Sequence, residues 1–100
     1  MARMRHEIIL APEAVEDLRR LQANVRAAVK DAIGVHLRNE PTKRSRSRIK
    51  RLKGLAQPQY RLRVDEVRVF YDVVESRVEI LAIIPKANAA AWLEKVGKKS

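Results

Sequence analysis

The chain has no cysteine among its 100 residues, and it has only three glycines and two histidines. Without cysteine it can form no disulfide framework, thiolate nucleophile or cysteine-based metal site. The glycines are scattered, so the sequence contains no glycine-rich loop of the kind that cradles phosphates. No HExxH pattern, paired-aspartate motif or histidine cluster occurs either, and we therefore expect neither a metal nor another cofactor.

Long hydrophobic runs are also missing. The apolar stretch at residues 8–11 ends at Pro12 and is too short for the core of a signal peptide. No other stretch is long enough to span a bilayer, so we expect a cytoplasmic protein that does not contact the membrane. The length predicts a single domain over residues 1–100, and an apolar share of 46% is sufficient for a core.

Acidic residues are few compared with basic ones. The chain has 12 Asp and Glu against 22 Lys and Arg, which gives a formal net charge of +10. A field of this sign attracts nucleic acid, anionic membrane or an acidic protein. Because the same charge destabilises the compact state by self-repulsion, we expect a partner that neutralises it.

The first half of the chain predicts a strand followed by two helices. A short β-branched run predicts the strand over residues 5–10, and Pro12 suits the first turn of a helix. Asn24 is the predicted cap of a second helix that continues to Pro41, and the short link predicts an antiparallel pair. His36 lies on the apolar stripe of this helix, which favours a hydrogen-bonded core histidine over a base or a ligand.

After Pro58 the period of the apolar residues changes to two, which predicts three strands. The predicted strands span residues 60–64, 67–73 and 78–84, with turns at residues 65–66 and 75–76. A short C-terminal helix is predicted around residues 89–96, followed by a frayed tail. The order β-α-α-β-β-β predicts an α+β fold in which two N-terminal helices pack on a mostly antiparallel four-stranded sheet.

Arginines gather on one side of the first predicted hairpin. With a two-residue loop at residues 65–66, Arg63 lies opposite Arg68, and Arg61 shares their side of the sheet. Two like charges placed opposite each other cost stability, and a bound anion relieves that cost. Guanidinium groups bind phosphate bidentately and remain charged, so the hairpin predicts a phosphate-binding cluster that Lys86 borders. The alternative is a solvated face on which Asp72 and Glu79 balance part of the charge.

A second basic segment lies at residues 42–54, where self-repulsion predicts a loop or a weakly held segment. The segment is either an arm that contacts the phosphates of RNA or a solubilising loop that an acidic partner covers. Its candidate phosphate-binding residues are Lys43, Arg44, Arg46, Arg48, Lys50, Arg51 and Lys53.

The chain resembles the RelE/ParE superfamily of toxins from bacterial type II toxin–antitoxin systems over about residues 7–95. The resemblance is carried by "APEAVEDLRRL" after the first strand and by "RLKGLAQPQYRLRVDEVRVFYDVVESRVEILAI". It implies a compact α+β fold of two N-terminal helices against an antiparallel sheet. RelE-type members cleave mRNA in the ribosomal A site without a metal, whereas ParE-type members poison DNA gyrase.

The resemblance also implies roles for individual residues. Arg61, Arg63 and Arg68 match basic residues that RelE-type enzymes use for phosphate binding, general base chemistry and transition-state charge. The implied reaction is attack of a ribose 2′-hydroxyl on the adjacent phosphorus, which leaves a 2′,3′-cyclic phosphate and a 5′-hydroxyl. The C-terminal segment departs from the pattern: Ala87 stands where an arginine is common and Leu93 where a tyrosine is common, with Lys86 one position from the arginine.

Three functions follow from these patterns. The leading hypothesis is a ribosome-dependent mRNA endonuclease toxin, held inactive by a cognate antitoxin whose acidic segment lies across the sheet. Its expected partners are the antitoxin, the ribosome with mRNA, and operator DNA through the antitoxin complex. The alternatives are a ParE-like gyrase inhibitor and a non-catalytic nucleic-acid-binding or corepressor module.

Overall fold

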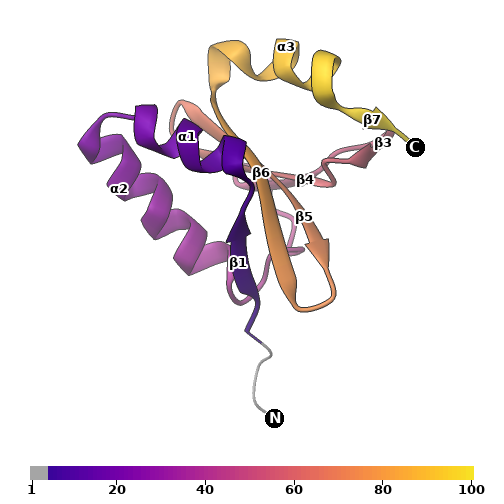
Figure 1. The fold of residues 1–100 in the computed structure, drawn as a ribbon. Coiled ribbons are helices and arrows are strands. Elements are labelled where there is room, and N and C mark those ends of the chain that lie inside the picture. The colour runs from indigo at the N-terminus through magenta and orange to yellow at the C-terminus, as the bar shows by residue number, and fades with distance from the viewer. Residues whose placement is uncertain (1–4) are drawn as a thin grey trace.

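The computed structural model describes residues 5–100, and residues 1–4 lie outside this part. Two helices pack on one face of a sheet, and a third helix crosses the opposite face (Figure 1). The helical elements are α1 (Pro12–Arg20), α2 (Ala23–Ala32), the π-helix η1 (Ile33–Leu37) and α3 (Lys86–Val96). The strands are β1 (Glu7–Leu10), β2 (Ile49–Arg51), β3 (Leu55–Gln57), β4 (Tyr60–Val64), β5 (Val67–Val74), β6 (Arg77–Pro85) and β7 (Lys98–Lys99).

The main sheet has five strands in the order β1-β6-β5-β4-β2. β1 pairs with β6 in parallel and the other pairs are antiparallel, so the predicted α+β fold with a mostly antiparallel sheet is confirmed. The prediction of four strands is wrong, because β2 forms inside the basic segment that was expected to be a loop or a weakly held segment. Ile49 of β2 lies opposite Leu62 and enters the core, and its burial together with the backbone pairing offsets the repulsion between neighbouring cations.

The helix pair follows the prediction except at the start of α2. The backbone of Gln22 is extended, and its carbonyl accepts the N–H of Arg26 (2.8 Å), so the helix begins at Ala23. Asn24 therefore lies inside the helix, and its predicted capping role is wrong. Within residues 5–100, none of the helices has the length and apolar character needed to cross a membrane.

The main core lies between the helix pair and the sheet. It is built from alternate residues of β4 and β5, as the two-residue period predicted, and from Val78, Ile80 and Ile83 of β6, where a register shift interrupts the alternation. Ala14 of α1, Val29 of α2 and Leu37 of η1 meet these strands and are fully buried. A smaller apolar cluster of Phe70, Ala82 and Ile84 lies on the opposite face under α3.

The C-terminal tail is ordered rather than frayed. Lys98–Lys99 form β7, which pairs with β3 in a second, two-stranded sheet, so the chain ends beside β3 (Figure 1). Between α3 and β7, the N–H of Gly97 bonds to the carbonyl of Leu93 (2.8 Å). A Cβ at position 97 would stand 2.5 Å from that oxygen, so the turn into β7 requires glycine.

Tyr71 connects the core to the segment that follows η1. Its ring is fully buried and stacks on Tyr60, and its hydroxyl donates to the carbonyl of Pro41 (2.6 Å). Burial, and then the neighbouring Tyr60, raise the pKa of the Tyr71 hydroxyl far above its ordinary value. The hydroxyl therefore acts as a neutral donor in the core, not at the edge of a site.

Tyr71→Phe should lower the free energy of unfolding by about 1 kcal/mol, because the buried Pro41 carbonyl loses its donor. Tyr60→Phe is the matched control, since the Tyr60 hydroxyl has no hydrogen bond within residues 5–100. Urea unfolding followed by circular dichroism measures both variants. Equal stabilities of the two variants would contradict the role given to the Tyr71 hydroxyl.

Candidate nucleic-acid interface

The β4–β5 hairpin carries the predicted arginine cluster. Its two-residue turn lies at Asp65 and Glu66, and the register places Arg63 opposite Arg68 and Arg61 opposite Phe70. Asp65 has a φ of 50°, a left-handed conformation that aspartate tolerates better than most residues. The predicted register is thus confirmed.

The cluster extends onto the neighbouring edge strand. Lys50 of β2 lies opposite Arg61, so it projects from the same face of the sheet as the hairpin arginines. We call the surface formed by Lys50, Arg61, Arg63 and Arg68 the arginine face. It lies on the side of the sheet opposite the helix pair.

Within residues 5–100, no carboxylate forms an ion pair with the arginine face. Arg61, Arg63 and Lys50 have neither an ion pair nor a side-chain hydrogen bond there. Glu79 lies 3.7 Å from Arg77 instead, and Asp72 is buried and bound to other groups. Asp72 and Glu79 therefore do not balance the charge of the arginine face.

Arg68 is the most buried of the four cations, with 7% of its surface exposed. Its Nη1 donates to the carbonyl of Asp65 (2.8 Å) and to that of Val67 (3.1 Å). These carbonyls hold the guanidinium against the hairpin turn and offset part of the repulsion from Arg63. Arg68 therefore has a structural role in the turn in addition to its charge.

Arg61 occupies the centre of the arginine face and is partly buried. Burial lowers the pKa of its guanidinium, and the neighbouring Arg68 and Arg63 lower it further. The group still carries its charge, because arginine does not deprotonate in proteins. Its Nε is buried and has no acceptor within residues 5–100. A bound anion would supply that acceptor and reduce the repulsion among the three arginines.

Lys86 begins α3 beside the hairpin turn. Its backbone N–H donates to the carbonyl of Glu66 (2.7 Å), and Pro85 before it lies opposite Val67. The structure thus brings Lys86 to the same end of the sheet as Arg68, and the lysine is exposed. The expected position of Lys86 at the border of the cluster fits this arrangement.

α3 forms an apolar flank on the same side of the sheet. Trp92 stacks on Phe70 with ring centroids 4.9 Å apart, and Leu93 packs against the same cluster. Ala87 is exposed at the start of the helix. Residues 87 and 93 therefore provide no polar group to the arginine face.

Tyrosine and histidine side chains, which commonly transfer protons, lie elsewhere. Tyr60 and Tyr71 pack on the core side of the sheet, and His36 belongs to a separate cavity. Among the residues described, no group of three or more His, Asp or Glu side chains is placed to hold a metal. The arginine face can bind and stabilise negative charge, and Lys50 is its one side chain of a type that commonly transfers protons.

The basic side chains of residues 42–54 lie in different environments. Lys50 joins the arginine face, whereas Arg44, Arg46 and Lys53 are exposed. Lys43 lies 3.5 Å from Glu40. Only part of the predicted arm therefore contributes to one common surface.

Arg51 faces the opposite side of the sheet from Lys50. Its Nη1 donates to the carbonyls of Gln59 (2.7 Å) and Leu52 (3.2 Å), and its guanidinium lies 5.3 Å from the centre of the Tyr60 ring. These contacts attach the end of β2 to the start of β4. Arg51 therefore has a structural role between β2 and β4.

A buried carboxylate holds the start of the hairpin, and sequence reasoning missed it. Asp72 accepts hydrogen bonds from Nε2 of Gln57 (2.7 Å) and from the backbone N–H of Gln59 (2.8 Å). The side-chain oxygen of Gln59 in turn accepts the N–H of Val73 (3.0 Å). A charged residue inside the otherwise apolar end of β5 was the available signal for such a network.

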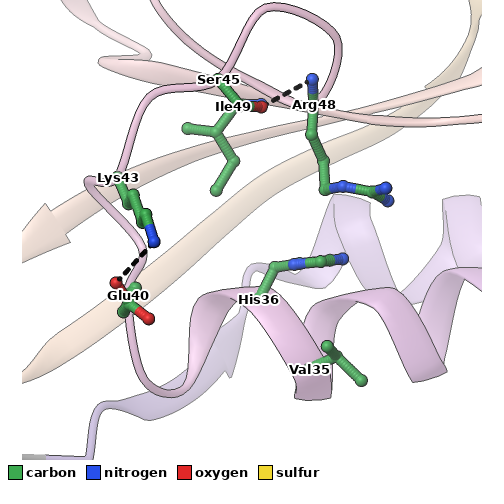
Figure 2. Close-up of a pocket in the computed structure, with 7 residues that line it drawn as sticks. All are labelled: Val35, His36, Glu40, Lys43, Ser45, Arg48 and Ile49. Carbon is green, nitrogen blue, oxygen red and sulfur yellow. Dashed lines mark hydrogen bonds and ion pairs between the residues drawn. The ribbon is translucent and has the colours of Figure 1, made fainter.

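His36 lines a cavity of about 230 Å³ between η1 and the basic segment. His36 is half-buried, so the prediction of a core histidine is wrong. The next residue of the π-helix η1, Leu37, enters the core instead. Figure 2 shows Arg48 extending from the loop toward the His36 imidazole, with Lys43 and Glu40 at another side of the cavity. Burial and then Arg48 lower the pKa of His36, and Asp31 opposes them.

Comparison with known proteins identifies similar sequences and folds. The family profile of the ParE toxin of type II toxin–antitoxin systems (parDE) matches residues 8–90. Curated protein sequences contain no match to the chain.

Several solved toxin structures share the fold. A chain of the archaeal RelE–RelB complex from Pyrococcus horikoshii OT3 is 23% identical, with a TM-score of 0.68 over 83% of this chain and 97% of that one. A chain of the RelBE2 toxin–antitoxin complex from Mycobacterium tuberculosis is 23% identical, with a TM-score of 0.67 over 81% and 98%. A mutant of the E. coli toxin RelE in the free state is 17% identical, with a TM-score of 0.67 over 93% and 99%. At these identities the likeness establishes the fold.

Asp72→Asn should lower the free energy of unfolding by about 1–3 kcal/mol, because an amide can accept only one of the two hydrogen bonds. Glu79→Gln, directly opposite on β6, is the matched control, and we expect a change within about 0.5 kcal/mol there because its ion pair is at the surface. Urea unfolding measures both. A neutral effect of Asp72→Asn would argue against the Asp72 network.

Proposed function

The chain belongs to the ParE toxin family of type II toxin–antitoxin systems, within the RelE/ParE superfamily, and we propose that this toxin is a ribosome-dependent endonuclease of mRNA. The observation that supports RNA as the target is the arginine face, where cations from three strands meet without a carboxylate partner. The buried, unpartnered Nε of Arg61 is the strongest single sign of a missing anion.

In the proposed reaction the 2′-oxygen of a ribose attacks the adjacent phosphorus and the bond to the 5′-oxygen breaks. The products are a 2′,3′-cyclic phosphate and a 5′-hydroxyl. The pentacoordinate transition state carries extra negative charge, which Arg61 and Arg63 stabilise from the open part of the arginine face. Arg68 adds its charge while it holds the hairpin turn, and Lys86 lies beside that turn.

Two proton transfers accompany this reaction: the 2′-hydroxyl loses a proton and the 5′-oxygen gains one. The arginine face has no histidine or tyrosine for either transfer. We therefore propose that groups of the ribosome or water carry the protons that Lys50 does not, and that the toxin positions the RNA and stabilises charge. This division of labour explains why the proposed activity depends on the ribosome.

We also propose a cognate antitoxin as the partner that neutralises the toxin. Two similar structures are toxin–antitoxin complexes, and the net charge of +10 favours an acidic segment that covers the arginine face. Operator DNA would be contacted through that complex.

The second candidate is inhibition of DNA gyrase through protein–protein contact. The matching family profile describes a ParE toxin, and Leu93 leaves the arginine face without a tyrosine. In this alternative the arginine face binds an acidic surface of the enzyme. The two candidates predict different first effects in a bacterial host.

Induction of the toxin should stop translation and produce mRNA cut within codons, mapped by primer extension. Arg61→Ala should reduce cleavage by at least about 100-fold, because it removes a cation from the centre of the face. Arg19→Ala on α1 is the control with the same loss of charge, since Arg19 pairs with Glu16 away from this face. Arg68→Ala is less informative, because it also loosens the turn.

DNA damage with normal translation in the same experiment would assign the protein to gyrase inhibition. Tight, salt-dependent RNA binding with no cleavage on ribosomes would assign it to a non-catalytic binding module. Either result overturns the proposed nuclease.

Co-expression with the antitoxin should restore growth and give a complex that co-purifies. If the acidic segment covers the arginine face, replacing its Asp and Glu by Asn and Gln should weaken the complex by about 10-fold or more, and the loss should shrink at high salt. Affinity measured at two salt concentrations checks this. An unchanged affinity would argue against masking by charge.

A further inference from the structure

The cavity beside η1 is separate from the arginine face. It lies between η1 and the segment that leads into β2, and it is lined by Val35, His36, Glu40, Lys43, Ser45, Arg48 and Ile49 (Figure 2). Apart from Val35 and Ile49, every lining residue carries a polar side chain. The cavity therefore suits a small polar or charged group.

Its charged groups favour an anion. The guanidinium of Arg48 has no hydrogen bond or ion pair within residues 5–100 and extends toward His36 (Figure 2). Lys43 lies 3.5 Å from Glu40, so the one acidic side chain in the cavity already faces a cation. The free charge that remains is that of Arg48, with His36 able to add a second positive charge.

Ser45 adds a hydroxyl donor to the cavity. Its Oγ accepts the backbone N–H groups of Arg48 (2.9 Å) and Ile49 (3.2 Å). Both bonds use the oxygen as acceptor, which leaves the hydroxyl proton free to donate. A guanidinium, an imidazole and a hydroxyl that converge on one space are suitable donors for a phosphate group.

Arg48 also links this cavity to the arginine face. It lines a second, shallower cavity of about 250 Å³ together with Ser47, Arg63 and Asp65. Its carbonyl accepts the N–H of Arg63 (2.8 Å), so the two arginines lie side by side at the edge of the sheet. Basic residues thus run from Arg61 through Arg63 and Arg48 to the cavity of His36, with the Asp65 carboxylate beside Arg63 and Arg48.

We propose that the cavity of His36, Ser45 and Arg48 is a second phosphate subsite, which holds a backbone phosphate of the RNA strand that lies on the arginine face. The identity of the ligand as RNA rests on the proposed function. A phosphodiester chain carries one negative charge per nucleotide, so a strand that crosses the β2 edge would meet Arg61, Arg63 and Arg48 in turn. The subsite anchors the strand without touching the reacting atoms.

The protonation of His36 reports whether the subsite is occupied. The groups that act on the imidazole are Arg48 from the loop, Asp31 from α2, and Glu40 with Lys43 from the segment after η1. In the free protein, burial and then Arg48 hold the pKa of His36 below its ordinary value, which disfavours the charged ring. A phosphate would favour the charged ring and raise this pKa, and affinity should therefore increase as the pH falls.

The experiment uses a hexanucleotide of 2′-O-methyl RNA, which lacks the attacking hydroxyl and cannot be cleaved. The pH titration of the His36 ring is followed by NMR with and without saturating oligonucleotide, and the His36 pKa should rise by roughly one pH unit. Arg48→Ala should weaken binding and reduce the slope of log affinity against log salt by about 0.7. Arg46→Ala is the matched control: it removes the same charge from the same loop but does not line the cavity.

Three results would overturn the subsite. An unchanged His36 pKa with saturating oligonucleotide would show that no phosphate enters the cavity. Equal losses for Arg48→Ala and Arg46→Ala would show that only the overall charge matters. A rise in the pKa with inorganic phosphate or with a poly-glutamate peptide, but not with the oligonucleotide, would assign the cavity to a free anion or to an acidic protein.

The same variants separate this inference from the proposed function. If the wild-type toxin cleaves no mRNA on ribosomes while the oligonucleotide still raises the His36 pKa, the nuclease fails and the phosphate subsite stands. If mRNA is cleaved, but the cleavage rate of Arg48→Ala depends on ribosome concentration as that of the wild type does, the nuclease stands. The subsite then has no part in cleavage. Arg61→Ala should keep the His36 response at saturation, because it leaves the cavity intact.

Discussion

The antiparallel pairing of β4 with β5 determines which side chains enter the core and which meet the solvent on the opposite face. Side chains alternate along a strand, so placing Leu62 and Val69 under the helix pair also places Arg61 and Arg68 on the other side. A shift of one residue would bury arginines and expose the core residues. The stability of the core therefore maintains the arginine face, even though the cations on that face repel one another.

The fold offsets this repulsion with neutral acceptors instead of carboxylates. Arg68 bonds to two carbonyls of the hairpin turn. The carboxylate of Asp72 on β5 accepts its hydrogen bonds from amide N–H groups of Gln57 and Gln59. The net positive field of the face is therefore preserved, and such a field attracts an anionic partner.

The short edge strand β2 extends the basic surface beyond the β4–β5 hairpin. By pairing with β4 it brings Lys50 onto the arginine face and holds Arg48 at the rim, next to the cavity of His36. A flexible loop of the same composition would carry the same charge without fixed positions. The order of β2 thus supports a defined path for a phosphate chain, which a diffuse positive charge would not provide.

The sequence by itself determined the α+β fold, the helix pair, the β4–β5 register and the grouping of Arg61, Arg63 and Arg68. Each follows from local rules: apolar periodicity, proline positions and a two-residue turn. Only the tertiary structure decided that residues 49–51 form a strand, that Asp72 is buried and that His36 lines a cavity. These outcomes depend on contacts between residues far apart in the chain, where packing and hydrogen bonding compete with local preference. Local patterns along the sequence do not show which side of that competition prevails.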